Sequence, residues 1–588
     1  MTAERPLDRG TSDPGAGGGR MTAAGRPLDG DTSGLAVTGG RATAGTTTAA
    51  TTGTTTAVPL IHNPVLPGFH PDPSILRVGE DYYLATSTFE WYPGVRLHHS
   101  RDLVHWRALG GVLTERRLLD LRGAGDSCGV WAPDLSYVDG RFYLIFTDVA
   151  SFESGYWDPR NYVVSAPDIN GPWSDPAPLH GRGFDPSLFH DEDGTSWLLS
   201  MSADWRPGRE PFAGIEAQRF DRDAMCVVGP VRTLFSGTEV GMTEGPRIYR
   251  RQGWYYLVTA EGGTSWEHQV TVARSRTLTG PYQPDPEGPL LTSRGRPDLE
   301  LQKAGHGALV ATPAGEWYLA HLVGRPYTPL GDCVLGRETA IQRVDWTPQG
   351  WPRVAGAVPA VEVPGPDLPP HPWPAEPEVD EFDAPRLGVH WSTLRRPAGE
   401  DWLSLSARPG YLRIHGGQSP VGRVAPSLVA RRVTSPECAL ETVMEFRPAN
   451  FRQLAGITAY YNTRNWHYAY VSLDDDGRRV LELLSRDGGH RIAHREARVD
   501  VTGVDRLGLR VEFDGPMVRF GYDTGGGWQG LPVELDATIL SDEHAAQIVP
   551  GEPEAWGFTG AFVGLWVQDL GGDGAYADFD RARFTSRE

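Results

Sequence analysis

The chain has 588 residues, a net charge of −20 and 22% charged residues. This length exceeds what one hydrophobic core supports, so we expect two domains with extensions. The acidic balance argues against nucleic acid and anionic membrane surfaces as partners. Four cysteines, at positions 128, 226, 333 and 438, follow no CxxC spacing. They predict reduced thiols, and neither a disulfide framework nor a zinc site.

Residues 1–57 form a low-complexity leader of Gly, Thr and Ala. With so few large apolar residues it cannot bury enough surface to fold, and we predict that it is disordered. No basic segment followed by an apolar one is recognised there, so no signal peptide is expected. No run of about eighteen apolar residues marks a membrane span. The sequence therefore predicts a cytoplasmic protein.

Residues 58–360 contain a repeated sequence motif, which we call the phrase. It first appears at Asp72, which lies between two prolines in HPDPS. Each proline fixes its own φ, and the second one disfavours helical conformations at the residue before it. We therefore expect Asp72 on a stiff, extended backbone at the start of a strand. A predicted hairpin follows, with SILRV and YYLAT flanking a turn at residues 79–81.

The same phrase recurs with Asp134, Asp185, Glu244 and His306 as its first residue, at spacings of 51 to 62 residues. We call the first residue of each copy its anchor. A repeat of this period with several strands per unit is typical of a β-propeller, and five units imply five blades. The first strand of each blade lines the central axis, so these five anchors are expected to converge. An acid at a strand start can be a simple turn former. Three acids gathered on one axis indicate a function instead, because clustered like charges are costly.

A Pro-rich linker is predicted at residues 361–378, and a second β-rich region without the phrase at residues 379–588. Segments of this region alternate or run apolar between turn signals, which suits a two-sheet sandwich. They are residues 439–446, 456–461, 467–473, 507–513, 517–522 and 562–567. No helix start is recognised in either domain. The predicted fold class is all-β: a five-bladed β-propeller followed by a β-sandwich.

Eight ordered motifs of the first domain carry a resemblance: HPDPS, STFEWYPGV, VWAPDLSY, GFDPSLFHD, TEGPRIY, AEGGTSWEH, GHGALV and LGRETAIQ. They resemble glycoside hydrolase family 43, and more narrowly its two-domain β-xylosidases with a concanavalin-like C-terminal domain. The segments ARPGYLRIHG, AGITAYYNTRNW and FTGAFVGLWV extend the resemblance to about residues 60–586. It implies a concanavalin-like jelly roll that contributes to the rim of the active site.

Hydrolysis of a glycosidic bond needs a carboxylic acid and a second carboxylate, roughly 6.5–9.5 Å apart when the anomeric configuration is inverted. The resemblance implies Asp72 as general base, Glu244 as general acid and Asp185 as a third carboxylate. The charge of Asp185 is expected to keep Glu244 protonated near neutral pH. Asp134, which shares the phrase, is interpreted as a structural hydrogen-bonding residue.

Substrate contacts are implied for five more residues. Trp131 and Ala132 would face the sugar in the −1 subsite. Phe89 would flank the bound sugars, or would simply pack within its blade. Arg337 would hold sugar hydroxyls and stabilise the ionised base, or would form a surface ion pair. Phe558, in the sandwich, would reach over the pocket and limit its depth, which makes the enzyme exo-acting.

The fifth anchor has two interpretations. His306 would hydrogen-bond near the general acid, or would bind a divalent cation, usually calcium, as in part of the family. A lone His is weak evidence for a metal, so no cofactor is predicted as a requirement and calcium stays an alternative. The short connection at residues 327–334 is expected to border the outer subsite. The resemblance also makes a homo-oligomer plausible.

The function predicted is an inverting, exo-acting β-D-xylosidase that releases xylose from the non-reducing ends of short xylo-oligosaccharides. Within the same class, the alternatives are an α-L-arabinofuranosidase or a bifunctional enzyme. A different class, a non-catalytic sugar-binding propeller, predicts that one of the anchor acids is missing, and Asp72, Asp185 and Glu244 are all present. A protein-interaction propeller would not need acids and an arginine on its axis.

Overall fold

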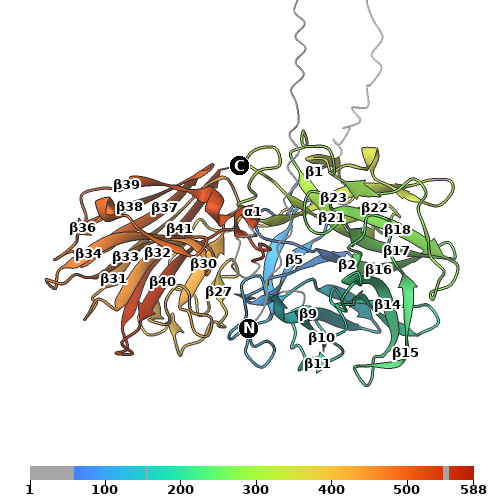
Figure 1. Cartoon of the computed structure of the whole chain (residues 1–588), viewed down its shortest axis with the longest axis horizontal. Coiled ribbons are helices and arrows are strands. Elements are labelled where there is room, and N and C mark those ends of the chain that lie inside the picture. The colour runs from blue at the N-terminus through green and yellow to red at the C-terminus, as the bar shows by residue number, and fades with distance from the viewer. Residues whose placement is uncertain (1–58, 154–155, 547–554, 588) are drawn as a thin grey trace, which may run out of the picture. The chain divides into compact units, whose positions relative to one another are not determined.

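The computed structural model of the chain describes residues 59–587, apart from 154–155 and 547–554. The predicted leader, residues 1–57, lies outside the described residues. Nearly all regular elements that are described are strands, which run from blue to yellow-green in the first domain and from orange to red in the second (Figure 1). Among these residues, no helix has the length and apolar character needed to cross a membrane.

The first domain consists of five antiparallel units that each contain a path of four strands. The first unit has β2 (Ser74–Val78), β3 (Asp81–Thr86), β5 (Gly94–Ser100) and β6 (Arg107–Leu113). The second has β8 (Asp134–Val138), β9 (Arg141–Glu153), β10 (Tyr156–Ala166) and β11 (Ala177–Pro178), with β7 (Gly129–Val130) beside β9. The third has β12 (Ser187–His190), β13 (Ser196–Ala203), β14 (Phe212–Asp221) and β15 (Cys226–Phe235).

The fourth unit has β16 (Glu244–Arg251), β17 (Trp254–Glu261), β18 (Gln269–Ser275) and β19 (Gln283–Pro284), with β20 (Leu291–Thr292) beside β18. The fifth has β21 (Gln302–Ala311), β22 (Trp317–Gly324), β23 (Arg337–Trp346) and β24 (Pro352–Arg353). The first strands contact one another in the cyclic order β2, β8, β12, β16, β21 and back to β2. This closed ring confirms the predicted five-bladed propeller.

Strand pairing joins the segment that precedes the first blade to the last blade and to the segment that follows it. Strand β1 (Leu60–His62) pairs with β25 (Glu362–Pro364), and Leu66 forms a bridge with Thr339 of β23. Strand β25 lies within the predicted linker, residues 361–378, so part of that Pro-rich segment is a paired strand. A short 3₁₀ turn at Ala355–Ala357 precedes it.

Two sequence expectations about the anchors were wrong in detail. Asp72 has φ of +55°, in the left-handed region, although it precedes a proline and was expected to be extended; Asp185, which also precedes a proline, has φ of +54°. The preference of a pre-proline residue is a local tendency, which tertiary contacts override here, as happens at functional sites. His306, at φ +47°, lies inside β21 and does not begin it, because the strand is irregular on both sides of Gly305.

The second domain consists of two large sheets. One has the order β28 (Leu403–Ser404), β29 (Leu412–His415), β41 (Tyr576–Arg587), β31 (Glu437–Phe446), β37 (Leu507–Asp514), β38 (Met517–Asp523) and β39 (Gln529–Asp536), with β26 (Val379–Asp380) on β41. The other contains β35 (His490–Ala493), β34 (Arg479–Asp487), β33 (Asn465–Leu473), β32 (Gln453–Asn462), β40 (Phe562–Asp569), β30 (Leu428–Arg432) and β27 (Ser392–Leu394), with β36 (Val499–Asp500) on β34. Buried aliphatic and aromatic side chains fill the space between them, which confirms the predicted sandwich.

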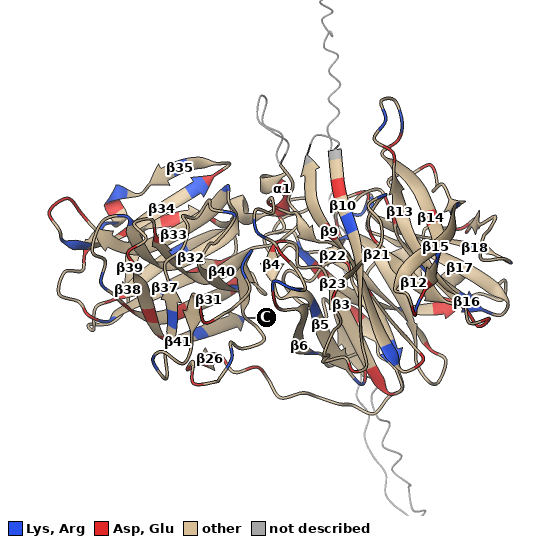
Figure 2. Cartoon of the chain, turned by 90° about the horizontal axis from the view of Figure 1, so that it is seen from below, with Lys and Arg blue, Asp and Glu red and all other residues tan. Residues whose placement is uncertain are grey.

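The second sheet ends in a strand that the propeller supplies. Strand β4 (Trp91–Tyr92), from the first blade, pairs with β27, and Figure 2 shows it between β40 of the sandwich and β5 of the propeller. Trp91 is fully buried and its ring stacks on Phe562 at 3.9 Å. The backbone pairing and this stacking join the two domains within the STFEWYPGV motif.

The expectation of no helices was wrong at one place. The described residues include a single α-helix, α1 (Asp542–Ala545), preceded by a 3₁₀ turn at Ala537–Leu540; another 3₁₀ turn lies at Arg495–Ala497. The side chain of Ser541 accepts a hydrogen bond from the backbone N–H of His544, as an N-cap does. A helix of four residues is too short to leave a periodic sequence pattern, and this one contributes to the site described next.

Candidate active site

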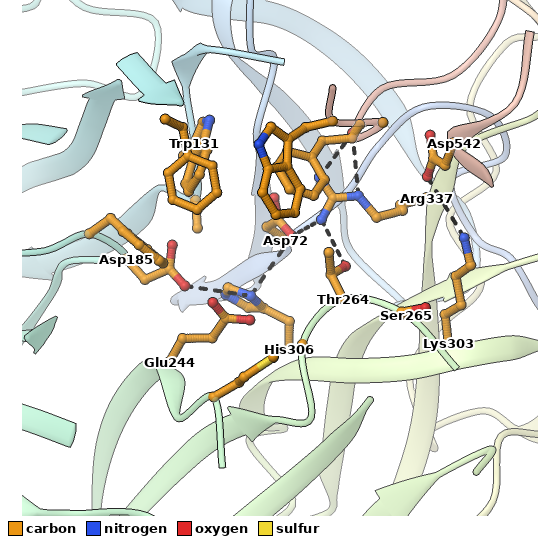
Figure 3. Close-up of a pocket in the computed structure, with 18 of the residues that line it drawn as sticks. Asp72, Trp131, Asp185, Glu244, Thr264, Ser265, Lys303, His306, Arg337 and Asp542 are labelled. Atoms are coloured by element: carbon orange, nitrogen blue, oxygen red, sulfur yellow. Dashed lines mark hydrogen bonds and ion pairs between the residues drawn. The ribbon is translucent and has the colours of Figure 1, made fainter. Parts of the chain in front are cut away.

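The site is a pocket of about 530 Å³ lined by residues of both domains. All nine residues predicted for the site line it: Asp72, Phe89, Trp131, Ala132, Asp185, Glu244, His306, Arg337 and Phe558. Asp72, Asp185, Glu244 and His306, which we call the pocket floor, come from four different blades. Figure 3 shows their side chains directed toward one common space. The convergence of the anchors expected from the repeat is therefore present for these four.

Asp72 lies in surroundings that suit a carboxylate anion. Its Oδ1 accepts a hydrogen bond from Nη1 of Arg337 at 3.1 Å, and its Oδ2 accepts one from the Ser87 hydroxyl at 2.6 Å. Arg337 is itself buried, at 4% exposure, so the interpretation as a surface ion pair is wrong. A charged donor on one oxygen and a hydroxyl on the other hold the carboxylate in a single orientation.

The other two carboxyl groups of the floor favour the protonated state. Burial, followed by the charges of Asp185 and Asp72, raises the pKa of Glu244 well above its usual value. Burial and the charge of Asp72 also raise the pKa of Asp185 to about 7, against the opposing effect of Arg247 and of a hydrogen bond from the Gly245 amide. The floor therefore combines a carboxyl group that accepts hydrogen bonds on both oxygens with two buried carboxyl groups whose pKa values are raised.

His306 lies between two of the acids. Its Nδ1 is 3.8 Å from Oδ1 of Asp72 and 4.0 Å from Oδ2 of Asp185 (Figure 3). Burial, with the charges of Arg247 and Arg337, holds the pKa of His306 well below its usual value, so the imidazole is neutral. On its other side the ring packs against Gly245, where a Cβ would come within 3.1 Å of it.

The residues around His306 do not form a cage for calcium. Calcium takes six to eight oxygen ligands, whereas the atom that His306 leaves without a partner is a single buried nitrogen, Nε2. The described residues contain no group of three or more His, Cys, Asp or Glu placed to hold a metal ion. We derive no catalytic step through a cation, and the calcium alternative stays a prediction.

Asp134 begins a copy of the same phrase but has a structural role. Its Oδ1 accepts hydrogen bonds from the Ser74 hydroxyl at 2.9 Å and from Nε of Arg247 at 3.2 Å. Its Oδ2 accepts one from the Leu188 amide at 3.1 Å. These partners belong to the first strands of three other blades, and Asp134 does not line the pocket. The structure therefore agrees with its interpretation as a residue that ties the blades together.

The sandwich supplies one side of the pocket, which we call the pocket wall: Asp542, Glu543, Trp556 and Phe558. The Phe558 ring lies 5.6 Å from that of Trp131 and 6.0 Å from that of Phe89. Nε and Nη2 of Arg337 donate hydrogen bonds to the Phe558 carbonyl at 3.3 and 2.9 Å. One arginine thus connects a carboxylate of the floor to the backbone of the wall.

A hydroxyl of the propeller also holds the wall in place. Ser127 donates a hydrogen bond to the Trp556 carbonyl at 2.9 Å and accepts one from the Phe558 amide at 3.2 Å. Its own carbonyl accepts a hydrogen bond from the indole N–H of Trp131 at 3.0 Å. Because Trp556 and Phe558 also stack on each other at 5.6 Å, they are positioned as a pair.

Comparison with known proteins agrees with this architecture. The sequence profile of glycosyl hydrolases family 43 matches residues 61–352, and that of the β-xylosidase C-terminal concanavalin A-like domain matches residues 379–585. A Vibrio protein described as a xylan 1,3-β-xylosidase is 45% identical over 88% of this chain and 98% of its own length. A Humicola insolens xylosidase/arabinosidase is 44% identical, over 89% and 97%. The chain belongs to glycosyl hydrolase family 43.

A solved structure supports the same assignment. The crystal structure of a xylan β-1,4-xylosidase from Bacillus halodurans is 48% identical, covers 90% of this chain and 100% of its own, and superposes with a TM-score of 0.87. This family 43 chain is therefore a glycoside hydrolase, and oligosaccharides are its class of substrate. The predicted propeller, concanavalin-like sandwich and enzyme class are confirmed.

Sequence reasoning missed the residues that surround the predicted ones. Aromatic and apolar side chains extend the pocket outward from the floor: Phe152, Trp157, Phe184, Phe212, Met242 and Trp556. Thr264 and Ser265 also line it, and Thr264 accepts a hydrogen bond from Arg337 at 3.0 Å. A signal existed for Phe184, which directly precedes the Asp185 anchor, and for Thr264, which lies in the AEGGTSWEH motif. The others follow no repeated pattern.

A charged cluster at the edge of the pocket was also missed. Lys303 of β21 is buried at 3% exposure and forms an ion pair with Glu543 of α1, while its Nζ lies 3.9 Å from Oδ2 of Asp542 (Figure 3). The expectation that residues 327–334 border the outer subsite was wrong, because none of them lines the pocket. Instead, the Cys333 amide donates a hydrogen bond to Glu543 at 2.8 Å and supports the helix.

Proposed function

We propose that this family 43 enzyme is an inverting, exo-acting β-D-xylosidase that removes xylose from the non-reducing ends of short xylo-oligosaccharides. The observation that carries the proposal is the chemical difference between two carboxyl groups in one pocket. Asp72 accepts hydrogen bonds on both oxygens, one of them from a guanidinium, while burial and neighbouring acids favour the protonated form of Glu244. A base and an acid are therefore present together at the pH of the reaction.

In the proposed mechanism, Asp72 takes a proton from a water molecule as that water attacks the anomeric carbon. Glu244 gives its proton to the glycosidic oxygen of the departing sugar on the opposite face. Arg337 and Ser87 orient Asp72 through the hydrogen bonds described above. Asp185, whose Oδ2 accepts a hydrogen bond from the amide that follows Glu244, keeps that acid protonated and oriented. The anomeric configuration of the released sugar is inverted.

The exo mode is supported by the position of the pocket wall. Phe558 stands against Phe89 and Trp131, which are the aromatic residues expected to flank the sugar. Aromatic faces on several sides suit the apolar faces of a pyranose ring. A wall from the second domain across a pocket of about 530 Å³ favours the terminal unit of a chain over an internal one.

Arabinofuranosidase activity on the same scaffold is the second candidate. It is favoured by the Humicola relative, whose name joins xylosidase and arabinosidase at 44% identity. The linkage is a further question, because the Vibrio relative is named for 1,3-linked xylan and the Bacillus structure for 1,4-linked xylan. The cytoplasmic location, the homo-oligomer and the calcium alternative stay predictions from the sequence.

Parallel hydrolysis assays test the proposal. The purified chain is given nitrophenyl β-D-xylopyranoside, nitrophenyl α-L-arabinofuranoside, 1,4-xylobiose and 1,3-xylobiose, and kcat/KM is measured for each. We expect the xyloside to exceed the arabinoside and both xylobioses to release xylose only. A large preference for the arabinoside would replace the proposal with its second candidate. Absence of turnover on all four substrates would contradict both.

A further inference from the structure

A second cavity, of about 360 Å³, lies where the first blade meets the sandwich. We call it the junction cavity. It is lined by Arg96 of β5, by Arg431 and Arg432 of β30, and by the imidazoles of His70 and His98, among others. It shares no lining residue with the pocket described above. Three guanidinium groups around one cavity are unusual, because like charges repel one another.

Two of these guanidinium groups converge on one neutral atom. Nη2 of Arg96 and Nη1 of Arg432 donate hydrogen bonds to the hydroxyl oxygen of Ser392, at 2.7 and 3.1 Å. Arg96 is 2% exposed and Arg432 is 6% exposed. Bringing two like charges together in a buried place is unfavourable unless an opposite charge compensates them.

The structure gives these two arginines no acid of their own. Arg96 also donates to the carbonyls of Val389 and Trp391, and Nε of Arg432 donates to the carbonyl of Phe69. In the part of the chain that is described, no carboxylate oxygen lies within 4.0 Å of either guanidinium. Burial lowers the pKa of Arg96 to about 10, so it still carries its charge at neutral pH.

The acids at the edge of the cavity are already engaged. Glu376 lies 3.6 Å from Nη2 of Arg431, and its side chain is half exposed. Glu378 lies 3.3 Å from Nη2 of Arg583 and is 63% exposed. These carboxylates pair with Arg431 and Arg583. The charge of Glu376 also acts on Arg96 and opposes the effect of burial on its pKa, but among the described residues neither Arg96 nor Arg432 has an acid of its own within 4.0 Å.

Five buried nitrogen atoms around the cavity have no hydrogen-bond partner in the described residues. They are Nε of Arg96, Nδ1 of His98, Nε2 of His390, Nη1 of Arg431 and Nη2 of Arg432, and all five residues line the cavity. Native proteins leave few buried polar atoms unsatisfied, so such a group in one cavity indicates a missing acceptor. The rings of Phe69 and Phe562, each 5.5 Å from the Arg432 guanidinium, attract the charge but leave the N–H groups unpaired.

We propose that the junction cavity binds a small tetrahedral oxyanion of the phosphate or sulfate type, which bridges Arg96 of the propeller and Arg432 of the sandwich. Guanidinium groups present several N–H donors in a plane, which matches the oxygens of such an ion. The ion supplies both the missing negative charge and the missing acceptors. Because its ligands come from both domains, its binding stabilises their association.

Calorimetric titration with inorganic phosphate tests the proposal on the full chain at constant ionic strength and neutral pH. We expect one saturable site, at least about tenfold weaker binding in Arg432→Gln, where a charged hydrogen bond is lost, and tighter binding in Glu376→Gln, where a nearby negative charge is removed. Arg447→Gln, at an arginine whose side chain is 78% exposed, is the matched control and should bind like the unaltered chain. Phosphate should also raise the unfolding temperature of the unaltered chain more than that of Arg432→Gln.

Three results of the titration would overturn the proposal: no saturable binding by the unaltered chain, undiminished binding by a folded Arg432→Gln variant, or binding of a sugar phosphate but not of free phosphate. Crystals of the unaltered chain soaked in selenate provide a test that does not depend on any variant folding. The anomalous signal of selenium should lie within hydrogen-bond distance of Arg96 and Arg432. Selenate found only elsewhere would also overturn the proposal.

Discussion

The floor and the wall of the catalytic pocket differ in how the chain builds them. The floor comes from one repeated phrase, which places Asp72, Asp185, Glu244 and His306 around the propeller axis. The wall comes from the sandwich, more than two hundred residues away from the last of these anchors. The floor is fixed by the closure of the ring, whereas the wall depends on contacts between two domains.

This difference implies a division of roles. The floor contains the carboxyl groups that would break the glycosidic bond, so substitutions in the floor should lower kcat. The wall contacts the substrate through aromatic faces and is held by Ser127 and Arg337 of the propeller. Substitutions in the wall should mainly raise KM. The predictions below test this division, from the largest expected effect to the smallest.

Asp72→Asn should cause the largest loss. An amide cannot take the proton of the attacking water, and removal of a general base costs on the order of 10⁴-fold in kcat. The loss should be equal for xylobiose and for nitrophenyl xyloside, because both need the same activated water. Asp134→Asn is the matched control from the same phrase, and it should keep its kcat even if its unfolding temperature falls. Near-normal kcat in Asp72→Asn would assign the base elsewhere.

Glu244→Gln should produce a loss that depends on the leaving group. A xylose leaving group needs a proton, so turnover of xylobiose should fall about 10²–10⁴-fold. Nitrophenolate departs without one, and hydrolysis of the nitrophenyl xyloside should fall much less. Steady-state kinetics on the two substrates measure the difference. Equal losses on both substrates would mean that Glu244 is not the proton donor.

Asp185→Asn should shift the pH dependence of the reaction. The charge of Asp185 helps to raise the pKa of Glu244, so its removal should lower that pKa and move the high-pH limb of kcat/KM to lower pH. The raised pKa of Asp185 also means that the stability it contributes is present in acid and is lost as pH rises from its unfolded value, about 4, to about 7. Unfolding of the variant should therefore depend less on pH between about 4 and 7. An unmoved kinetic limb would contradict this electrostatic role.

Phe558→Ala tests the wall. Loss of its contacts with Phe89 and Trp131 should raise KM for xylobiose roughly tenfold, as expected for one aromatic contact, with a smaller change in kcat. Trp528→Ala is the matched control, because Trp528 is a 43% exposed aromatic residue of the same domain that does not line the pocket. A fall in kcat with KM unchanged would contradict the division between floor and wall.

Ser127→Ala should have the smallest effect. It removes two hydrogen bonds that position Trp556 and Phe558, and a single one contributes about 0.5–1.5 kcal/mol. We expect KM to rise a few-fold and kcat to stay near its normal value. Restoration of normal KM in Ser127→Thr, which keeps a hydroxyl, would support positioning as the cause. An unchanged KM in Ser127→Ala would show that the wall holds its position without this residue.

The floor could be predicted from the sequence because the copies of a repeat can be recognised by comparison within one chain. Five similar phrases imply a ring, and a ring brings anchors distant in the chain to one axis. The different uses of Asp72 and Asp134 could not be derived from the phrase alone, since the partners of Asp134 lie on other blades. The left-handed backbone at Asp72 was missed because local preferences do not contain the contacts that override them.

The wall and the junction cavity show the limit of that reasoning. Phe558 was named through a family resemblance, and no pattern in the sequence marks it. Lys303 and Glu543, or Arg96 and Arg432, become neighbours only when the two domains associate. Pairings of this kind depend on the three-dimensional arrangement of two domains, which local sequence patterns do not encode.

The configuration of the first sugar released tests the central claim most directly. Proton NMR of the unaltered chain with 1,4-xylobiose, recorded within the first minutes, separates the two anomers before they interconvert. A water activated by Asp72 and a proton donated by Glu244 on opposite faces of the sugar predict that α-xylose is released first from the non-reducing end. Initial release of β-xylose would require a covalent intermediate and would contradict the assignment of Asp72 as a general base.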